Sequence, residues 1–288
     1  MKDSKIKNIA QELFSTCYLV EKEIVGHSDE VSKRWAKANS IRHAYTILAI
    51  DNYLKNTHKD ALKISNIELL NASGLACGHQ DFSICEYFLK RYSIEWTVFE
   101  SPRSPYLDKK KFKELVEKFS IKIELSDFSS TDNPYGMGQY NIILFTEIIE
   151  HLDHSTLLNS LKSIRNRLKD KGILILTTPN LARLENRIKL LFGNGDLGYW
   201  GDGCENLKKG LWGHIAYYDA HRLDRILRDT GFCCVQYYSF NHRGPELNLF
   251  LKIIKKIIDF TSLFVKNSKQ NIFITAKKSD IKKIPFQI

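Results

Sequence analysis

The order of apolar and polar positions divides the chain into a helical beginning and a longer stretch of short apolar runs. In the first 62 residues, apolar side chains recur at helical spacing, as in Ile6, Ile9 and Leu13. This spacing predicts amphipathic helices. From residue 67 onward, short apolar runs alternate with segments of helical periodicity. That alternation predicts an α/β fold in which helices cover both faces of a parallel sheet.

The individual strands and helices follow from the lengths of the runs and from their turn residues. The unbroken apolar run at 141–145 (NIILF) is typical of a central strand, buried on both faces. Lys171 and Gly172 are predicted to close the helix before the fifth strand, and Asp219 to cap the last helix, which Gly231 stops. The predicted strands are 67–72, 96–100, 121–125, 141–145, 173–177, 232–240 and 271–276. The predicted helices are 82–91, 109–119, 155–168 and 220–229.

Changes in composition predict how the chain is organised. Residues 1–62 are interpreted as an N-terminal helical cap or lead-in, residues 63–280 as one α/β domain, and residues 281–288 as a tail. Within the domain, residues 192–213 contain seven of the 15 glycines together with several aromatic residues. A long glycine-rich and aromatic loop is a candidate lid over a binding site.

The segment 247–265 is apolar but is interrupted by Lys252, Lys255, Lys256 and Asp259. These charges exclude a membrane-spanning helix. Two interpretations stay open: a helix packed on the domain, or an amphipathic helix that contacts a membrane or a partner. No run of 18 apolar residues and no signal-peptide pattern is present, which favours a cytoplasmic location.

Charge and cysteine content limit the chemistry. The formal net charge of +10 is compatible with nucleic acid, an anionic lipid or an anionic small substrate as partner, and also with a solvated lysine-rich surface. The six cysteines form no C-x-x-C pair and lie at no metal-binding spacing from histidines. We therefore expect free thiols, no disulfide framework and no metal site.

Three motifs occur in an order that resembles the class I S-adenosylmethionine (SAM) dependent methyltransferases, especially the broad group acting on small molecules. The first is the strand at 140–146 with the E-x-x-E-H-L sequence at 147–152. The second is L-K-D-K-G at 168–172, followed by a strand that ends in T-P-N at 178–180. The third is G-H-I-A-Y-Y at 213–218. The resemblance covers about 60% of the chain and implies a seven-stranded, mostly parallel, Rossmann-like methyltransferase sheet with SAM as cofactor.

The resemblance also implies which residues contact SAM, because ligands of such sheets collect at the carboxyl ends of the strands. Glu100 ends the second strand and is placed to accept hydrogen bonds from the ribose hydroxyls. Asp127 and Phe128, after the third strand, match the adenine contacts of the family. The full set of candidate cofactor-binding residues is Asn71, Ser73, Gly74, Gly78, Glu100, Asp127, Phe128, Thr146 and Glu147.

The loop after the first strand departs from the family pattern of an acid followed by G-x-G-x-G. Asn71 stands in place of the acid, and only Gly74 and Gly78 remain of the glycines. Asparagine still forms hydrogen bonds and Ser73 still permits a turn, so the loop is compatible with SAM binding in a longer form. A relative that has lost SAM and catalysis would show the same change.

Methyl transfer to a hydroxyl requires positioning and a general base, and His151 and His214 are the candidates for that base. Candidate substrate-binding residues are the aromatic side chains Tyr199, Trp200, Trp212, Tyr217 and Tyr218. The predicted reaction transfers a methyl group from SAM to a small acceptor that is anionic or sugar-linked, such as a cell-surface glycan precursor. The alternatives are a nucleic-acid methyltransferase and a non-catalytic, methyltransferase-like binding subunit.

Overall fold

The computed structural model describes residues 2–57, 67–73, 79–102, 104–125, 139–194, 214–241, 256–258, 260–262 and 264–279. The chain divides into two compact units. The first consists of Met1–Leu144, Asn166–Ile175 and His242–Glu246, and the second of Phe145–Arg165, Leu176–Asn241 and Leu247–Ile288. The predicted lid at 192–213 lies almost wholly outside the described residues, as does the predicted tail.

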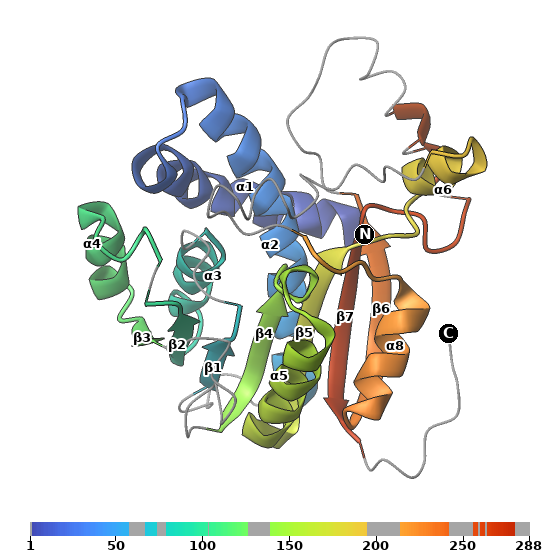
Figure 1. Cartoon of the computed structure of the whole chain (residues 1–288). Helices are drawn as coiled ribbons and strands as arrows, with labels where there is room; N and C mark the ends of the chain where they lie inside the picture. The colour runs from blue at the N-terminus through green and yellow to red at the C-terminus, as the bar shows by residue number, and fades with distance from the viewer. Residues whose placement is uncertain are drawn as a thin grey trace. The chain divides into compact units, whose positions relative to one another are not determined.

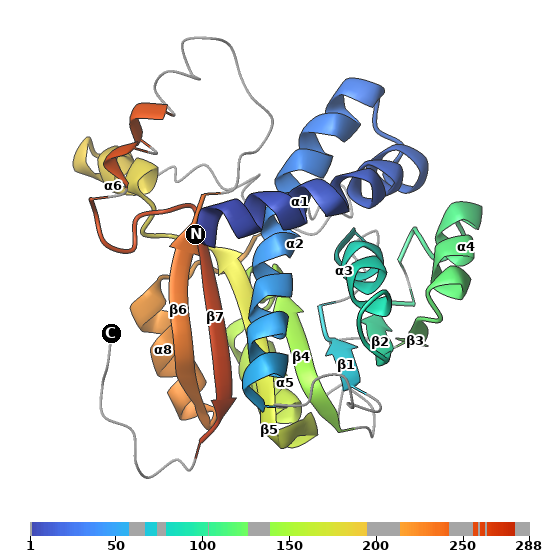
Figure 2. The ribbon, with the colours of Figure 1, turned by 180° about the vertical axis from the view of Figure 1, so that it is seen from behind.

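The beginning of the chain is helical, as its periodicity predicts. Helix α1 (Lys2–Leu19) continues into a short π-helix, η1 (Val20–Val25), and helix α2 (Asp29–Thr57) follows. Gly26 ends η1 in the left-handed conformation, with φ of +89°. Helix α1 packs on α2 and on α3 (His79–Leu89), and Figures 1 and 2 show α1 crossing α2 from both sides. The apolar stripe of α1 is buried in this contact.

Seven strands form one hydrogen-bonded sheet in the order β3-β2-β1-β4-β5-β7-β6. The pairs β1–β2, β1–β4 and β2–β3 are parallel, and β6–β7 is antiparallel. This confirms the predicted fold class. The strands are β1 (Ile67–Asn71), β2 (Ile94–Glu100), β3 (Lys122–Leu125), β4 (Tyr140–Thr146), β5 (Leu168–Pro179), β6 (Phe232–Phe240) and β7 (Asn271–Lys278).

Helices follow most strands, as expected of α/β connections. Helix α8 (Ala220–Asp229) packs on β6 and covers one face of the β6–β7 pair in Figure 1, while Figure 2 shows the other face of that pair. A single 3-10 turn, η4, directly follows β4. The remaining elements are α4 (Lys110–Lys118), η4 (Ile149–His151), α5 (His154–Arg167), α6 (Leu184–Leu191) and α8 (Ala220–Asp229).

Gly172 has a different role from the predicted one. Helix α5 ends at Arg167, and Gly172 lies inside strand β5 and does not close the helix. A Cβ atom at Gly172 would lie 2.9 Å from the backbone oxygen of Asn141 and 2.8 Å from Leu168 Cδ1. Glycine is therefore needed here because the backbone of β4 passes too close for any side chain.

The ends of α8 match their predicted signals. The carboxylate of Asp219 accepts hydrogen bonds from the backbone nitrogens of His221 (2.8 Å) and Arg222 (3.0 Å), which is N-capping. Gly231 follows the helix with φ of +82°. A Cβ atom on Gly231 would lie 2.5 Å from Nε of Arg165, which donates to the Gly231 carbonyl oxygen.

The Gly231→Ala substitution is expected to lower the free energy of unfolding by about 2–4 kcal/mol, because positive φ costs an L-residue about 1–2 kcal/mol and the new Cβ displaces Arg165. Gly26→Ala is the matched control, since Gly26 also has positive φ but nothing within 4 Å of its Cβ position. Urea unfolding of both variants measures the difference. Equal losses in the two variants would show that Arg165 simply moves aside.

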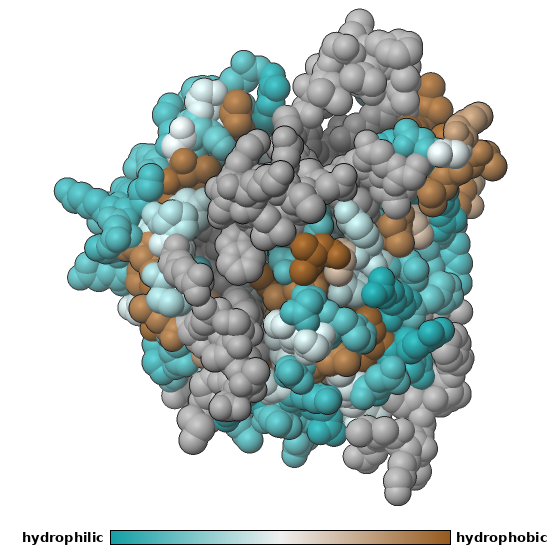
Figure 3. All heavy atoms as spheres, in the orientation of Figure 1, coloured by the Kyte–Doolittle hydropathy of each residue, from teal (hydrophilic) through white to brown (hydrophobic). Residues whose placement is uncertain are grey.

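Several large apolar side chains of the second unit are exposed. Leu191 and Phe192, at the end of α6, are each 81% exposed, and Phe264 is 76% exposed. Figure 3 shows hydrophobic side chains gathered over the region of α6. Residues 247–265 are described only in part, so the predicted amphipathic helix there stays a prediction. Among the described residues, no helix combines the length and the apolar character needed to cross a membrane.

Candidate active site

In the first unit, Asn71 organises the carboxyl end of β1. Its side chain is 1% exposed, and its Nδ2 donates to both carboxylate oxygens of Asp81, each at 2.9 Å. The Oδ1 of Asn71 accepts from the backbone nitrogen of Ser73 at 3.0 Å, and Ser73 Oγ donates to the carbonyl oxygen of Leu144 at 3.4 Å. Asn71 therefore holds both the start of the turn and the start of helix α3.

Asp81 is a buried carboxyl group that the sequence did not single out. Trp96 Nε1, on β2, donates to Asp81 Oδ1 at 2.7 Å, so that β1, α3 and β2 meet at this side chain. The pKa of Asp81 is raised to about 7, chiefly by burial and to a smaller extent by the nearby charge of Glu100. The hydrogen bonds from Asn71 and Trp96 oppose this rise. The sequence offered one signal for Asp81: it is an acidic residue ten positions after Asn71, which stands where the family has its acid.

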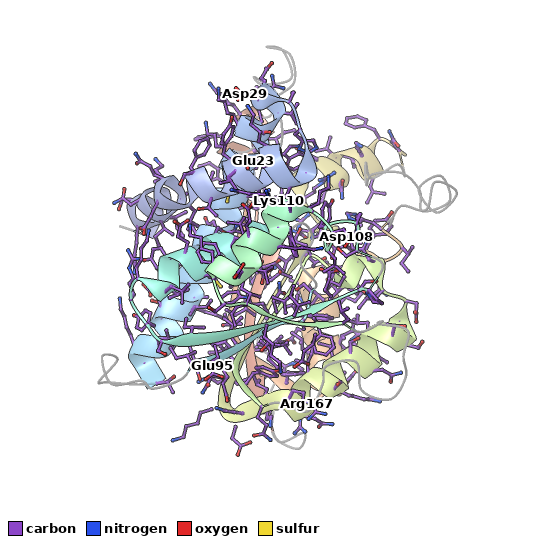
Figure 4. All side chains as sticks on the ribbon, turned by 90° about the vertical axis from the view of Figure 1, so that its left-hand side faces the viewer. Glu23, Asp29, Glu95, Asp108, Lys110 and Arg167 are labelled. Atoms are coloured by element: carbon purple, nitrogen blue, oxygen red, sulfur yellow. The ribbon has the colours of Figure 1, made fainter. Side chains whose placement is uncertain are left out.

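Asp81→Asn is expected to flatten the dependence of stability on pH. The carboxyl group titrates near 3.8 when unperturbed and near 7 in the folded protein, so between these values the folded protein binds more protons. The stability contributed by this group is fully present below about pH 4 and is lost as the pH rises through 7. Urea unfolding from pH 4 to pH 7 measures the slope. The exposed Asp108, labelled in Figure 4, supplies the control Asp108→Asn, and equal slopes for Asp81→Asn and wild type would contradict the expectation.

Glu100 ends β2, the strand next to β1, as predicted. Its side chain is 7% exposed, and Oε1 accepts a hydrogen bond from the backbone nitrogen of Ser101 at 2.9 Å. A carboxylate at this strand end fits the ribose hydroxyls of SAM, since a carboxylate accepts several hydrogen bonds at once. Four other predicted cofactor contacts lie outside the described residues: Gly74, Gly78, Asp127 and Phe128.

In the second unit, Thr146 is the last residue of β4 and Glu147 directly follows it. Thr146 is buried, and Glu147 adopts a positive φ of 52°, which is rare for a residue with a side chain. Two contacts with Thr177 on β5 hold this conformation: Glu147 N donates to Thr177 O at 2.9 Å, and Thr177 Oγ1 donates to Glu147 Oε1 at 2.8 Å. Backbone strain of this kind clusters at functional sites.

His151 and His214 lie together, although 62 residues separate them in the sequence. Their ring centroids are 4.7 Å apart in an edge-to-face arrangement. Glu150 joins them, and one ligand atom from each of the three side chains lies within 4.8 Å of the other two. The structure thus brings both predicted catalytic histidines into one cluster and adds a buried carboxylate to it.

Hydrogen bonds connect Glu150 to strand β5 and to the residues that follow His214. The backbone nitrogens of Ile215 and Ala216 donate to the carbonyl oxygen of Glu150 at 2.8 and 3.1 Å, and Thr178 Oγ1 donates to Glu150 Oε2 at 2.9 Å. Burial, followed by the charge of His151, lowers the pKa of His214 to about 4. His214 is therefore a neutral imidazole at physiological pH.

The predicted substrate-binding aromatics are described only in part. Tyr217 is partly exposed, whereas Tyr218 is 1% exposed and its backbone bridges to Asn180. The guanidinium of Arg222 lies 5.0 Å from the centre of the Tyr218 ring. Tyr217 is therefore the better placed of the two to reach a ligand. Tyr199, Trp200 and Trp212 lie outside the described residues.

A family model described as "Methyltransferase domain" matches residues 44–237, about two thirds of the chain. The chain belongs to this family. The methyltransferase resemblance predicted from the three motifs is thereby confirmed, and with it SAM as the cofactor. No curated protein sequence matches this methyltransferase significantly.

Solved structures agree with the methyltransferase fold. The chain is similar to a SAM-dependent methyltransferase from Clostridium acetobutylicum, with 12% identity, a TM-score of 0.50 and coverage of 92% of this chain and 98% of that one. It is also similar to the CMeT domain of the citrinin polyketide synthase, with 15% identity, a TM-score of 0.53 and coverage of 91% of this chain and 60% of that one. At these identities the likeness concerns the fold.

Proposed function

We propose that this methyltransferase transfers the methyl group of SAM to an oxygen atom of a small acceptor. The observation that carries the proposal is the convergence of Glu150, His151 and His214 immediately after β4. Two imidazoles beside a carboxylate are suited to holding a hydroxyl group and removing its proton. A neutral amine acceptor would not require such a group of side chains, because it attacks through its own lone pair without first losing a proton.

Several of the predicted cofactor contacts belong to the first unit. Glu100 would accept hydrogen bonds from the ribose hydroxyls, and Asn71 and Ser73 would shape the turn beside the amino-acid end of SAM. When bound, SAM would supply a methyl group from its positively charged sulfur, with the neutral thioether as leaving group. The residues of this chain would orient the acceptor, assist the loss of its proton and exclude water.

Two features support a small acceptor that is anionic or sugar-linked, such as a glycan precursor. The net charge of +10 favours encounter with anions, and Tyr217 offers an aromatic face of the kind that stacks on sugar rings. A nucleic-acid acceptor is the alternative that the same charge allows. It predicts binding that weakens steeply with salt, because phosphate contacts release counterions.

Calorimetry with SAM and with its demethylated product tests the cofactor half of the proposal. We expect one site per chain for each ligand, with dissociation constants in the micromolar range typical of enzyme ligands. No binding at high micromolar ligand would overturn the enzymatic function and favour a non-catalytic, methyltransferase-like subunit. Detection of methylated products from pooled small hydroxylated acceptors, with labelled SAM, then tests the acceptor half.

A further inference from the structure

The cluster of Glu150, His151 and His214 has the composition of a metal site. All three side chains belong to the second unit, and their ligand atoms lie within 4.8 Å of one another. We propose that they bind one divalent first-row transition-metal ion, and that this ion binds the acceptor oxygen. The first half of this proposal stands alone, whereas the second half rests on the proposed function.

The separations are close to what a single ion requires. Ligand atoms bonded to one zinc-sized ion at about 2.1 Å lie at most about 4.2 Å apart, so small rotations of the side chains bring the three within range. Two imidazole nitrogens and one carboxylate oxygen form the donor set of open catalytic zinc sites. Nitrogen donors also favour zinc or cobalt over magnesium and calcium, which prefer oxygen-rich sites.

The surroundings of the cluster orient it for this role. Thr178 Oγ1 donates a hydrogen bond to Oε2 of Glu150 and so helps to orient the carboxylate. Hydrogen bonds to the ligand residues orient them in the same way in metal sites. The backbone bonds from Ile215 and Ala216 to the Glu150 carbonyl oxygen hold the residues next to His214 against the residue before His151. These hydrogen bonds hold the segment that contains His214 next to the segment that contains Glu150 and His151.

Three protein ligands leave at least one coordination position for the acceptor. A hydroxyl group bound there would have a lowered pKa, as metal-bound water does, and would release its proton to solvent before the oxygen attacks the methyl group. The acceptor would then contribute one oxygen atom as the fourth ligand, in keeping with the transfer to oxygen proposed above.

The direct test uses tag-free protein stripped with a chelator and titrated with Co²⁺ and Zn²⁺ alone, without SAM. We expect one ion per chain by calorimetry and a visible absorption spectrum for the Co²⁺ form. Glu150→Gln and His214→Gln are expected to weaken binding at least about 100-fold, and the positioning variant Thr178→Val by about 10-fold or more. His221→Gln is the control, because His221 is exposed and lies outside the cluster.

Thermal melting of each variant separates loss of folding from loss of the site. The proposal predicts that Zn²⁺ raises the melting temperature of wild type and His221→Gln but not of a folded His151→Gln or His214→Gln variant. Wild-type protein that binds neither ion at millimolar concentration, or folded cluster variants that bind like wild type, would overturn it. Because SAM is absent, failure here is distinct from failure of SAM binding.

Discussion

Replacing His214 with alanine is expected to lower kcat by at least about 100-fold while changing the dissociation constant of SAM less than about twofold. A group that takes part in proton removal from the acceptor contributes about 10²- to 10⁴-fold to the rate. His214 lies in a cluster with His151 and Glu150, whereas Glu100 is the residue assigned to the ribose of SAM. Steady-state kinetics and SAM calorimetry on the same preparation give both values.

The control for this experiment is His221→Ala. His221 lies in the same unit at the start of α8, and its side chain is exposed. Its replacement is expected to leave kcat within about twofold of wild type. If His214→Ala keeps full turnover, the cluster has no role in the reaction. If it loses SAM affinity as much as turnover, His214 serves the cofactor, which contradicts the division of roles proposed here.

The second large effect is expected at Glu100. Glu100→Ala should raise the dissociation constant of SAM about 10- to 100-fold, because a hydrogen bond to a charged acceptor contributes about 1.5–3 kcal/mol and each 1.4 kcal/mol is tenfold in affinity. Glu100→Gln, which keeps one acceptor oxygen, should fall between wild type and Glu100→Ala. Calorimetry with SAM measures all three proteins.

Glu95→Gln is the matched control for Glu100. Both residues lie on β2, but Glu95 is exposed at the beginning of the strand, where Figure 4 labels it, and Glu100 is buried at the end. The control removes the same charge from the same strand and is expected to leave SAM affinity unchanged. Equal affinity of wild type and a folded Glu100→Ala variant would refute the ribose assignment.

Most of the fold was predictable from local patterns. The apolar run 141–145 predicted a central strand and lies within β4, and Asp219 predicted the start of α8. The prediction that Gly172 closes a helix was wrong, because the glycine allows the backbone of Asn141 to approach closely. This is a contact between two strands, which local sequence patterns do not predict. The boundaries of the predicted cap, the lid and the amphipathic helix stay predictions.

The residues of the candidate site could be predicted one by one, but which of them lie together could not. His151 and His214 were chosen separately, and nothing in their spacing predicted an edge-to-face contact with Glu150 beside them. The expectation of no metal site rested on cysteine spacing, which is blind to ligands from distant segments. Asp81 was missed because an acid in a helix is ordinarily solvated, and only its burial against Asn71 and Trp96 distinguishes it.

The α/β fold, the methyltransferase family and the position of Glu100 at a strand end could be predicted from the amino-acid sequence, because they depend on periodicity and on the local order of motifs. The partners of Asn71 and the cluster of Glu150, His151 and His214 are visible only in the folded protein. Those contacts join segments ten or more residues apart, and they form only when strand pairing and the backbone bonds to Glu150 bring the segments together.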